Sequence, residues 1–154
     1  MEDSSSPKNS AFPRSPYDTV GGIVFFGRVL DKIRLHAAGR LPDGYFLGDD
    51  SDPTWMDGRC TRFLHVTYKA LAERVLAGGS DEEILGWCFA NGRRPGAEEI
   101  LIFNAFLTKR GWRDTASPEL ENLKRAEGLT GRPGIHTFFD FQDADEGRSS
   151  RFAD

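Results

Sequence analysis

The stretch GGIVFFGRVLDKIRLHAAG, residues 21–39, decides the fold class of this chain. Its apolar residues recur at spacings of three and four, which is the period of an α-helix, and its last glycine is typical of a helix end. We therefore predict a helix that covers residues 22–38 and stops at Gly39. One face of this helix is apolar and is formed by Phe26, Val29, Leu30, Ile33 and Ala37.

The opposite side of this predicted helix carries both charged and apolar residues. Arg28, Asp31 and Lys32 lie there, and so do Val24, Phe25 and Leu35. A helix that is apolar on both sides usually packs between other elements. We therefore expect a central helix in which Asp31 can reach both Arg28 and Arg34 at three-residue spacing.

Helix boundaries recur along the rest of the chain. The clearest signal is SDEE at 80–83, in which Ser80 and Glu83 can form a capping box. Residues 137–141 (TFFDF) fit either a helical turn or a docked extended segment, and no convincing alternating strand occurs. The fold class we predict is all-α, a compact bundle of five or six short helices. After the first, the predicted helices cover residues 59–64, 67–77, 80–91, 95–110 and 117–128.

The length and composition fit one folded domain. The chain has 154 residues, of which 38% are hydrophobic and 29% charged, so a single packed core is feasible. Residues 1–16 are rich in Ser and Pro and predict a flexible arm, whereas residues 144–154 predict a polar tail. The all-helical domain is expected between them, over residues 17–143.

Charge and motif content exclude several classes of protein. The net charge of −4 argues against a nucleic-acid partner. There is no apolar run of about 20 residues and no signal-peptide core, so we expect a cytoplasmic protein with no membrane partner. Nucleotide-binding glycine motifs are missing and the three histidines lack partners at ligand spacing. The sequence therefore predicts neither a cofactor nor a metal site.

Four motifs resemble those of a known family. They are SPYDTVGGIVFFGRVLDKIRLHAAGRLP (15–42), DGRCTRFLHVTYKALAERV (57–75), SDEEILGWCFANGRRP (80–95) and FFDFQDADEGR (138–148). In their order they resemble the bacterial family catalogued as domain of unknown function 5069. The resemblance implies a small all-helical bacterial protein. It carries no catalytic or binding residue over to this chain.

The charged side of the first helix is the main candidate site. Arg28, Lys32 and Arg34 could line a cationic pocket for an anionic small molecule, because guanidinium groups bind carboxylates and phosphates through paired hydrogen bonds. Alternatively, these charges form a structural ion-pair network that docks the helix against residues 45–57, or they belong to a surface for a partner protein.

Reactive groups also gather in MDGRCTRFLHVTY, residues 56–68. His65 is our first choice for a general acid-base residue because imidazole titrates near neutrality, with Asp57 and Asp31 as further proton-transfer groups. Cys60 could pair with His65, although a buried cysteine and a surface or capping histidine explain the pattern more simply.

Two functional hypotheses follow from these clusters. The first is a small enzyme or binding domain for an anionic small molecule, built on the cationic helix and His65. The second is a non-catalytic protein-interaction or regulatory module. The sequence leaves open both the choice between them and the oligomeric state.

Overall fold

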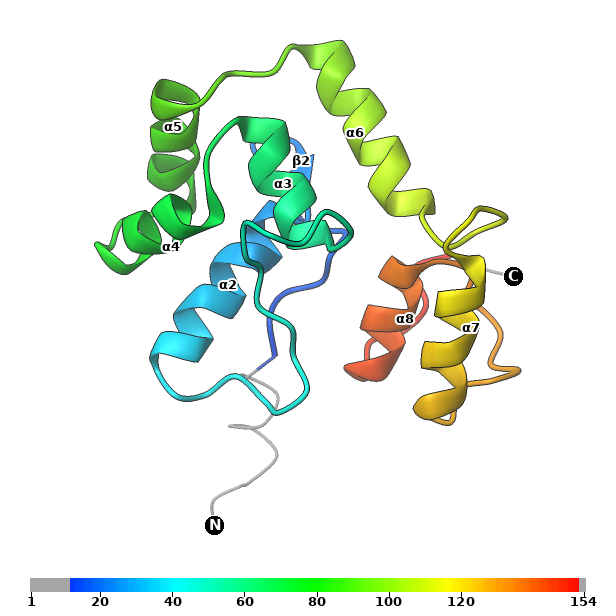
Figure 1. Cartoon of the computed structure of the whole chain (residues 1–154). Coiled ribbons are helices and arrows are strands. Elements are labelled where there is room, and N and C mark those ends of the chain that lie inside the picture. Colours follow the sequence, from blue (N-terminus) through cyan, green and yellow to red (C-terminus); the bar gives the residue numbers. More distant parts are fainter. Residues whose placement is uncertain (1–11, 153–154) are drawn as a thin grey trace.

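The computed structural model describes residues 12–152, which are mainly helical (Figure 1). Seven helices lie in this part of the chain: α2 (Phe26–Ala37), α3 (Met56–Leu64), α4 (Tyr68–Leu76), α5 (Asp81–Asn91), α6 (Ala97–Lys109), α7 (Ser117–Ala126) and α8 (Phe138–Asp145). The predicted helical fold class is therefore confirmed in outline, whereas the predicted count of five or six helices was too low. The additional helix is α8, at the segment for which the sequence left two conformations open.

A local cap and two buried rings explain why α8 is helical. The side-chain oxygen of Thr137 accepts a hydrogen bond from the Asp140 backbone N–H at 3.1 Å, which caps the helix start. Phe139 and Phe141 are both buried. Such burial depends on neighbours that are distant in the sequence, so the TFFDF pattern alone could not select a helix over an extended segment.

The first predicted helix begins later than expected because a small hairpin occupies its start. Strands β1 (Thr19–Val20) and β2 (Ile23–Val24) pair antiparallel. The connecting Gly21 and Gly22 both have positive φ, 57° and 80°, as a tight two-residue hairpin turn requires. Phe25 then takes a left-handed φ of 70°, and α2 starts at the next residue.

The helix α2 is central, as its two-sided apolar pattern predicted. It packs against α3, α4 and β1. Phe26, Val29 and Leu30 have no exposed surface, and the charged residues Arg28 and Lys32 are also buried, at 4% and 5% exposure. The charged side of this helix is therefore inside the protein and is not a solvated face.

The two apolar clusters define two lobes, which we name here. The first lobe runs from β1 to α5 and contains most of the larger cluster, which also includes Leu107 of α6 and Phe139 of α8. The second lobe consists of α7, α8 and their connection, around a cluster of Leu120, Leu129, Ile135 and Phe141. The helix α6 runs between the lobes and contacts β2 on one side and α8 on the other (Figure 1).

Segments at both edges of the predicted domain pack against the fold. Of the predicted arm 1–16, residues 1–11 lie outside the described part, while Pro13 and Ser15 are buried. Of the predicted tail 144–154, Glu146 is buried and Arg148 donates a hydrogen bond to the Pro13 carbonyl. In the described parts of these segments, the charges of Arg14, Glu146 and Arg148 have partners inside the protein.

Candidate functional site

A cavity of about 730 Å³ lies between the two lobes. The first lobe contributes residues of α2, the start of α3 and the loop before α3, while the second contributes residues of α7 and α8. Phe25, Phe46, Trp55, Phe138 and Phe141 supply aromatic surface to its wall. Its volume and its mixture of aromatic and polar groups are typical of small-molecule sites.

Arg28 reaches the cavity from α2 and is held by a carboxylate of the second lobe. Its two terminal nitrogens donate to the two oxygens of Glu146 at 2.9 and 2.6 Å. Tyr45 and Arg148 also donate to Glu146. Burial opposes ionisation of Glu146, but these hydrogen bonds outweigh it and lower its pKa. Arg28 is thus already neutralised within the fold.

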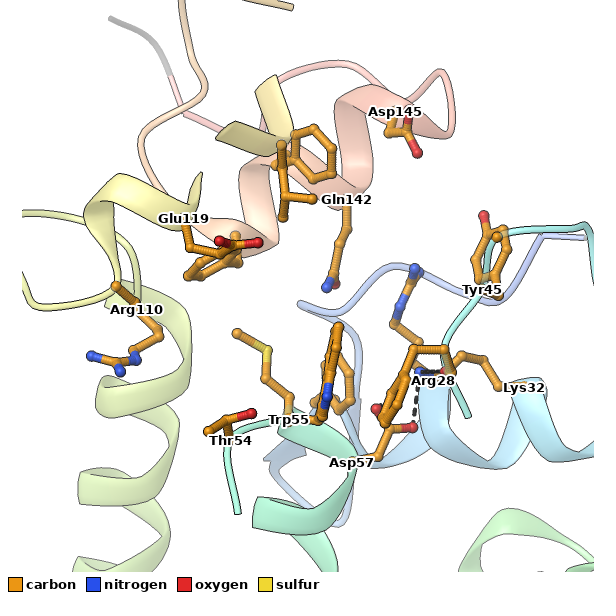
Figure 2. A pocket seen from close by; sticks show the side chains of 18 of the residues that line it. Arg28, Lys32, Tyr45, Thr54, Trp55, Asp57, Arg110, Glu119, Gln142 and Asp145 are labelled. Carbon is orange, nitrogen blue, oxygen red and sulfur yellow. Dashed lines mark hydrogen bonds and ion pairs between the residues drawn. The ribbon is translucent and has the colours of Figure 1, made fainter. Parts of the chain in front are cut away.

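Lys32 lies one turn further along α2 and is also paired. Its Nζ is 2.9 Å from Asp57 Oδ1 and donates to the Phe46 carbonyl at 2.9 Å, which ties α2 to the loop before α3 (Figure 2). Burial lowers the pKa of Lys32, and Asp57 opposes that effect. The pair therefore places a nearly buried amine and its carboxylate partner at the cavity wall.

The structure places the other predicted residues of α2 outside the cavity. Asp31 accepts hydrogen bonds from Arg14 at 2.9 Å, and Arg34 pairs with Asp81 at 2.8 Å. Arg14 also pairs with Asp81 at 2.8 Å, so these four residues form one ion-pair cluster. The expected partnership of Asp31 with Arg28 is replaced by that with Arg14, because Arg28 turns toward Glu146.

His65 lies away from the cavity as well. It ends α3 with a left-handed φ of 61° and is exposed. Cys60 faces the core, with Sγ 4.0 Å from the Val24 carbonyl oxygen, and burial raises the pKa of its thiol. Of the predicted site residues, Asp57 lines the cavity together with Arg28 and Lys32, whereas His65, Asp31 and Arg34 do not.

One end of the cavity holds two arginines, Arg59 and Arg110. Arg59 and Arg110 both lie over the ring of Phe106, at 5.1 and 5.5 Å from its centroid. Burial, together with repulsion from Arg110 and Arg62, lowers the pKa of Arg59. Arg110 pairs with Asp114 at 3.3 Å, whereas no carboxylate in the described part of the chain lies within 4.0 Å of Arg59. Arg59 is therefore the cation at this end that is suited to an anion.

The other end of the cavity is acidic. Asp145 is exposed at the rim, yet partial desolvation and the nearby carboxylates of Glu127 and Glu146 raise its pKa. Asp43 lines the cavity too. Figure 2 shows Arg110 and Glu119 on one side of the cavity and Asp145 on the opposite side. A cationic group is therefore favoured near Asp145.

Trp55 and Gln142 stand between these two ends (Figure 2). The ring of Trp55 stacks on Phe46, with centroids 3.9 Å apart, and is still 46% exposed. Gln142 projects from α8, and its Oε1 is buried without a hydrogen-bond partner. Arg28 Nε is also buried without a partner, whereas Asp57 Oδ2 lies 2.8 Å from Lys32 Nζ. Unpaired buried polar atoms are uncommon in folded proteins, so the two at this cavity call for an explanation.

The acidic residues of the described chain do not gather into a metal site. Among residues 12–152, no group of three or more His, Cys, Asp or Glu side chains is placed to hold a metal ion. Two acids of the Asp49–Asp52 run make short local turns: Asp49 accepts from Ser51 and Asp52 accepts from Thr54. Asp50 accepts from the Tyr68 N–H at the start of α4.

Comparison with known families gives one match. The model of the domain of unknown function DUF5069 matches residues 10–148. The chain belongs to this family. The match includes every helix from α2 to α8, so both walls of the cavity lie within the DUF5069 domain. No curated protein matches the chain. In the described residues, no helix has both the length and the apolar character needed to cross a bilayer.

Sequence reasoning missed several residues of the cavity. Trp55 and Tyr45 lie in a loop whose path depends on Lys32 and Asp57, and Gln142 and Glu146 come from a segment taken to be the end of the domain. The available signal was FFDFQDADEGR, which combines aromatic and acidic residues at helical spacing.

Proposed function

We propose that the cavity binds a small molecule with an anionic group at one end, an amino group at the other and a flat apolar body between them. The observation that carries this proposal is the charge along an aromatic-lined cavity, where Arg59 at one end has no carboxylate partner among the described residues, and Asp145 and Glu127 lie at the other end. The exposed face of Trp55 offers the apolar body a surface to stack on.

Like the hypothesis drawn from the sequence, this proposal gives the ligand an anionic group, but it assigns other residues to bind that group. Arg28 and Lys32 are neutralised by Glu146 and Asp57, so their ion pairs would form a rigid polar wall. The unpartnered Arg28 Nε and Gln142 Oε1 would give that wall one donor and one acceptor after a small side-chain rotation. Asp31, Arg34 and His65 have no part in it because they do not line the cavity.

If the ligand is also a substrate, Lys32 and Asp57 are the proton-transfer groups we propose. They share a hydrogen bond at the cavity wall, and burial lowers the pKa of Lys32, which moves this amine toward the range useful for acid-base chemistry. This role replaces the one that the sequence suggested for His65, while Asp57 is retained from the sequence hypothesis.

The test is a thermal-shift series with amphoteric small molecules and one matched set of probes. The probes are the peptide Gly-Trp-Gly and its N-acetylated, C-amidated and doubly blocked forms, which remove one or both charges without changing the indole. A ligand about 100-fold above its Kd adds roughly 2.7 kcal/mol to the stability of the folded state, so the rise in Tm is several degrees. We expect the peptide with both charges to give the largest rise.

Variants then assign each charge to its end of the cavity. Arg59→Gln should abolish the advantage of a free carboxylate, and Asp145→Asn should abolish the advantage of a free amine. Arg132→Gln is the control because Arg132 is exposed and lies outside the cavity. Equal shifts from all four peptides, or an unchanged ranking in both cavity variants, would contradict the proposal.

A further inference from the structure

The outer face of α6 carries an apolar stripe that the described chain leaves largely exposed, although Arg59 and Arg110 lie over the ring of Phe106 at one edge. Leu101, Ile102 and Phe106 are 68%, 61% and 42% exposed, and Ala105 between them is exposed as well. Their spacing places them on one side of the helix. Leu107, in contrast, has no exposed surface, so α6 is attached to the fold by its other side. Contiguous exposed apolar side chains mark interaction surfaces.

Charged residues stand at both ends of this stripe and have opposite signs. Glu98 lies on the stripe near the start of α6, and Lys109 lies on it at the end. Both are exposed. A membrane-binding helix would instead carry cations along its polar flank. The stripe is thus apolar in the middle, acidic at one end and basic at the other.

This arrangement is complementary to itself when a second α6 runs antiparallel. A two-fold axis midway between residues 103 and 104 brings Glu98 of one copy level with Lys109 of the other. The same axis brings Leu101 level with Phe106, and Ile102 level with Ala105, so a large side chain meets a small one at the centre. Two-fold interfaces require such self-complementarity, because each patch must match itself.

A hollow beside the stripe gives the second copy a place to insert side chains. It has a volume of about 380 Å³ and is lined by Phe63, Glu99, Ile102, Phe103 and Phe106. Phe63 and Phe103 stack at its base with centroids 4.1 Å apart, which gives the hollow a rigid apolar floor. Apolar side chains that seat in such a hollow form the central contacts of stable interfaces.

We propose that two copies of this chain associate through α6, antiparallel and about this two-fold axis. The occupant of the apolar stripe is therefore a second copy of the same protein. Its registry is fixed by two Glu98–Lys109 pairs, one at each end of the shared face. This inference is independent of the ligand proposed for the cavity.

The first experiment is sedimentation equilibrium of the full chain over a wide range of concentration. We expect a monomer–dimer equilibrium, with a Kd that rises at least about tenfold in Ile102→Asp. Leu76→Asp is the matched control, because Leu76 is 59% exposed on α4, outside the stripe. A chain that stays monomeric at every concentration overturns the proposal, and so does a dimer unaffected by Ile102→Asp.

A charge-swap series tests the registry and does not depend on apolar substitutions. Glu98→Lys or Lys109→Glu alone places like charges opposite each other, so each should weaken the dimer severalfold. The double variant recreates both pairs with reversed sign and should return the Kd to the wild-type value. Circular dichroism verifies that the monomers remain folded. Single changes without effect, or a double variant as weak as the singles, would refute the antiparallel registry.

Discussion

At the scale of single residues, the interior of this protein holds two buried cations, each paired with a carboxylate. Arg28 is 4% exposed and Lys32 is 5% exposed, but each has a carboxylate partner at 2.6 to 2.9 Å. A buried charge without a partner costs several kcal/mol, whereas a well-paired one is tolerated. The pairs therefore serve to fix how α2 meets the loop before α3 and the end of α8.

The ion-pair cluster outside the cavity gives a prediction about pH. Burial opposes ionisation of Asp81, but hydrogen bonds from Arg14 and Arg34 lower its pKa below the model-peptide value of 3.8. The folded state therefore binds fewer protons than the unfolded state near that value. Its stabilising contribution is complete above pH 3.8 and is lost as the pH falls through the folded-state pKa.

The variant Asp81→Asn should remove this dependence. We expect it to cost roughly 1 kcal/mol in the free energy of unfolding at neutral pH and to flatten the decline of stability below about pH 4. Urea denaturation between pH 2.5 and 7 measures both effects. Glu82→Gln is the control, since Glu82 shares the first turn of α5 and is exposed. A variant that retains the wild-type acid slope would show that Asp81 is not responsible.

At the scale of elements, local signals set most helix boundaries. The capping box at Ser80 forms as predicted, with both reciprocal hydrogen bonds at 2.8 and 3.1 Å. Lys109 and the glycine at 111 close α6 where the sequence indicated. The predicted start of α2 at residue 22 was wrong. Residues 23–24 pair with residues 19–20 in a hairpin, and helical periodicity within one segment does not reveal such pairing.

Two glycines at α5 should respond to alanine in opposite ways. Gly86 lies inside α5 and an added Cβ would meet nothing within 4 Å, so Gly86→Ala should stabilise the protein by roughly 0.5–1 kcal/mol. Gly92 follows α5, and an added Cβ would lie 2.0 Å from the Leu64 carbonyl oxygen. Gly92→Ala should therefore destabilise by roughly 2 kcal/mol or more, because backbone must move.

Chemical denaturation of both variants provides the measurement, and each serves as the control for the other. Because both substitutions add the same methyl group, one inside α5 and one just after its end, a difference in sign isolates the local geometry. Two variants with equal stability would contradict the close approach of residue 92 to the end of α3.

At the scale of the whole molecule, the cavity exists because two lobes meet. Neither lobe contains it alone: α2 and the loop before α3 supply one wall, and α7 and α8 supply the other. The lobes are joined by Arg28–Glu146, by Tyr17 donating to Asp140 at 2.6 Å, and by Phe139 packing between Tyr17 and Phe25. Ligand binding there would couple to the stability of this junction.

Shortening the chain tests how much the junction depends on its last residues. A chain that ends at Asp143 lacks Glu146 and Arg148, so Arg28 stays buried without its carboxylate. We expect a loss of roughly 3–5 kcal/mol in the free energy of unfolding. A chain that ends at Arg148 keeps both residues and should stay within about 1 kcal/mol of the full chain. Thermal and urea unfolding compare the three proteins, and similar losses in both truncations would contradict this role of Glu146.

The sequence by itself determined the helical class, the position of α2 at the centre, the capping box of α5 and the membership of the family. These properties depend on periodicity and on residues within about four positions of one another, which a single chain displays directly. The predicted division into arm, domain and tail stays a prediction, although Ser15 and Glu146 are buried beyond its limits.

Only the tertiary structure decided which charges face each other. The sequence placed Asp31 between Arg28 and Arg34, but Arg28 pairs with Glu146, 118 positions away, and Arg14 takes its place beside Asp31. Arg59 and Asp145 come to opposite ends of one cavity for the same reason. A buried charged side chain pairs with the opposite charge that the fold places next to it. Packing between the lobes determines which charge that is.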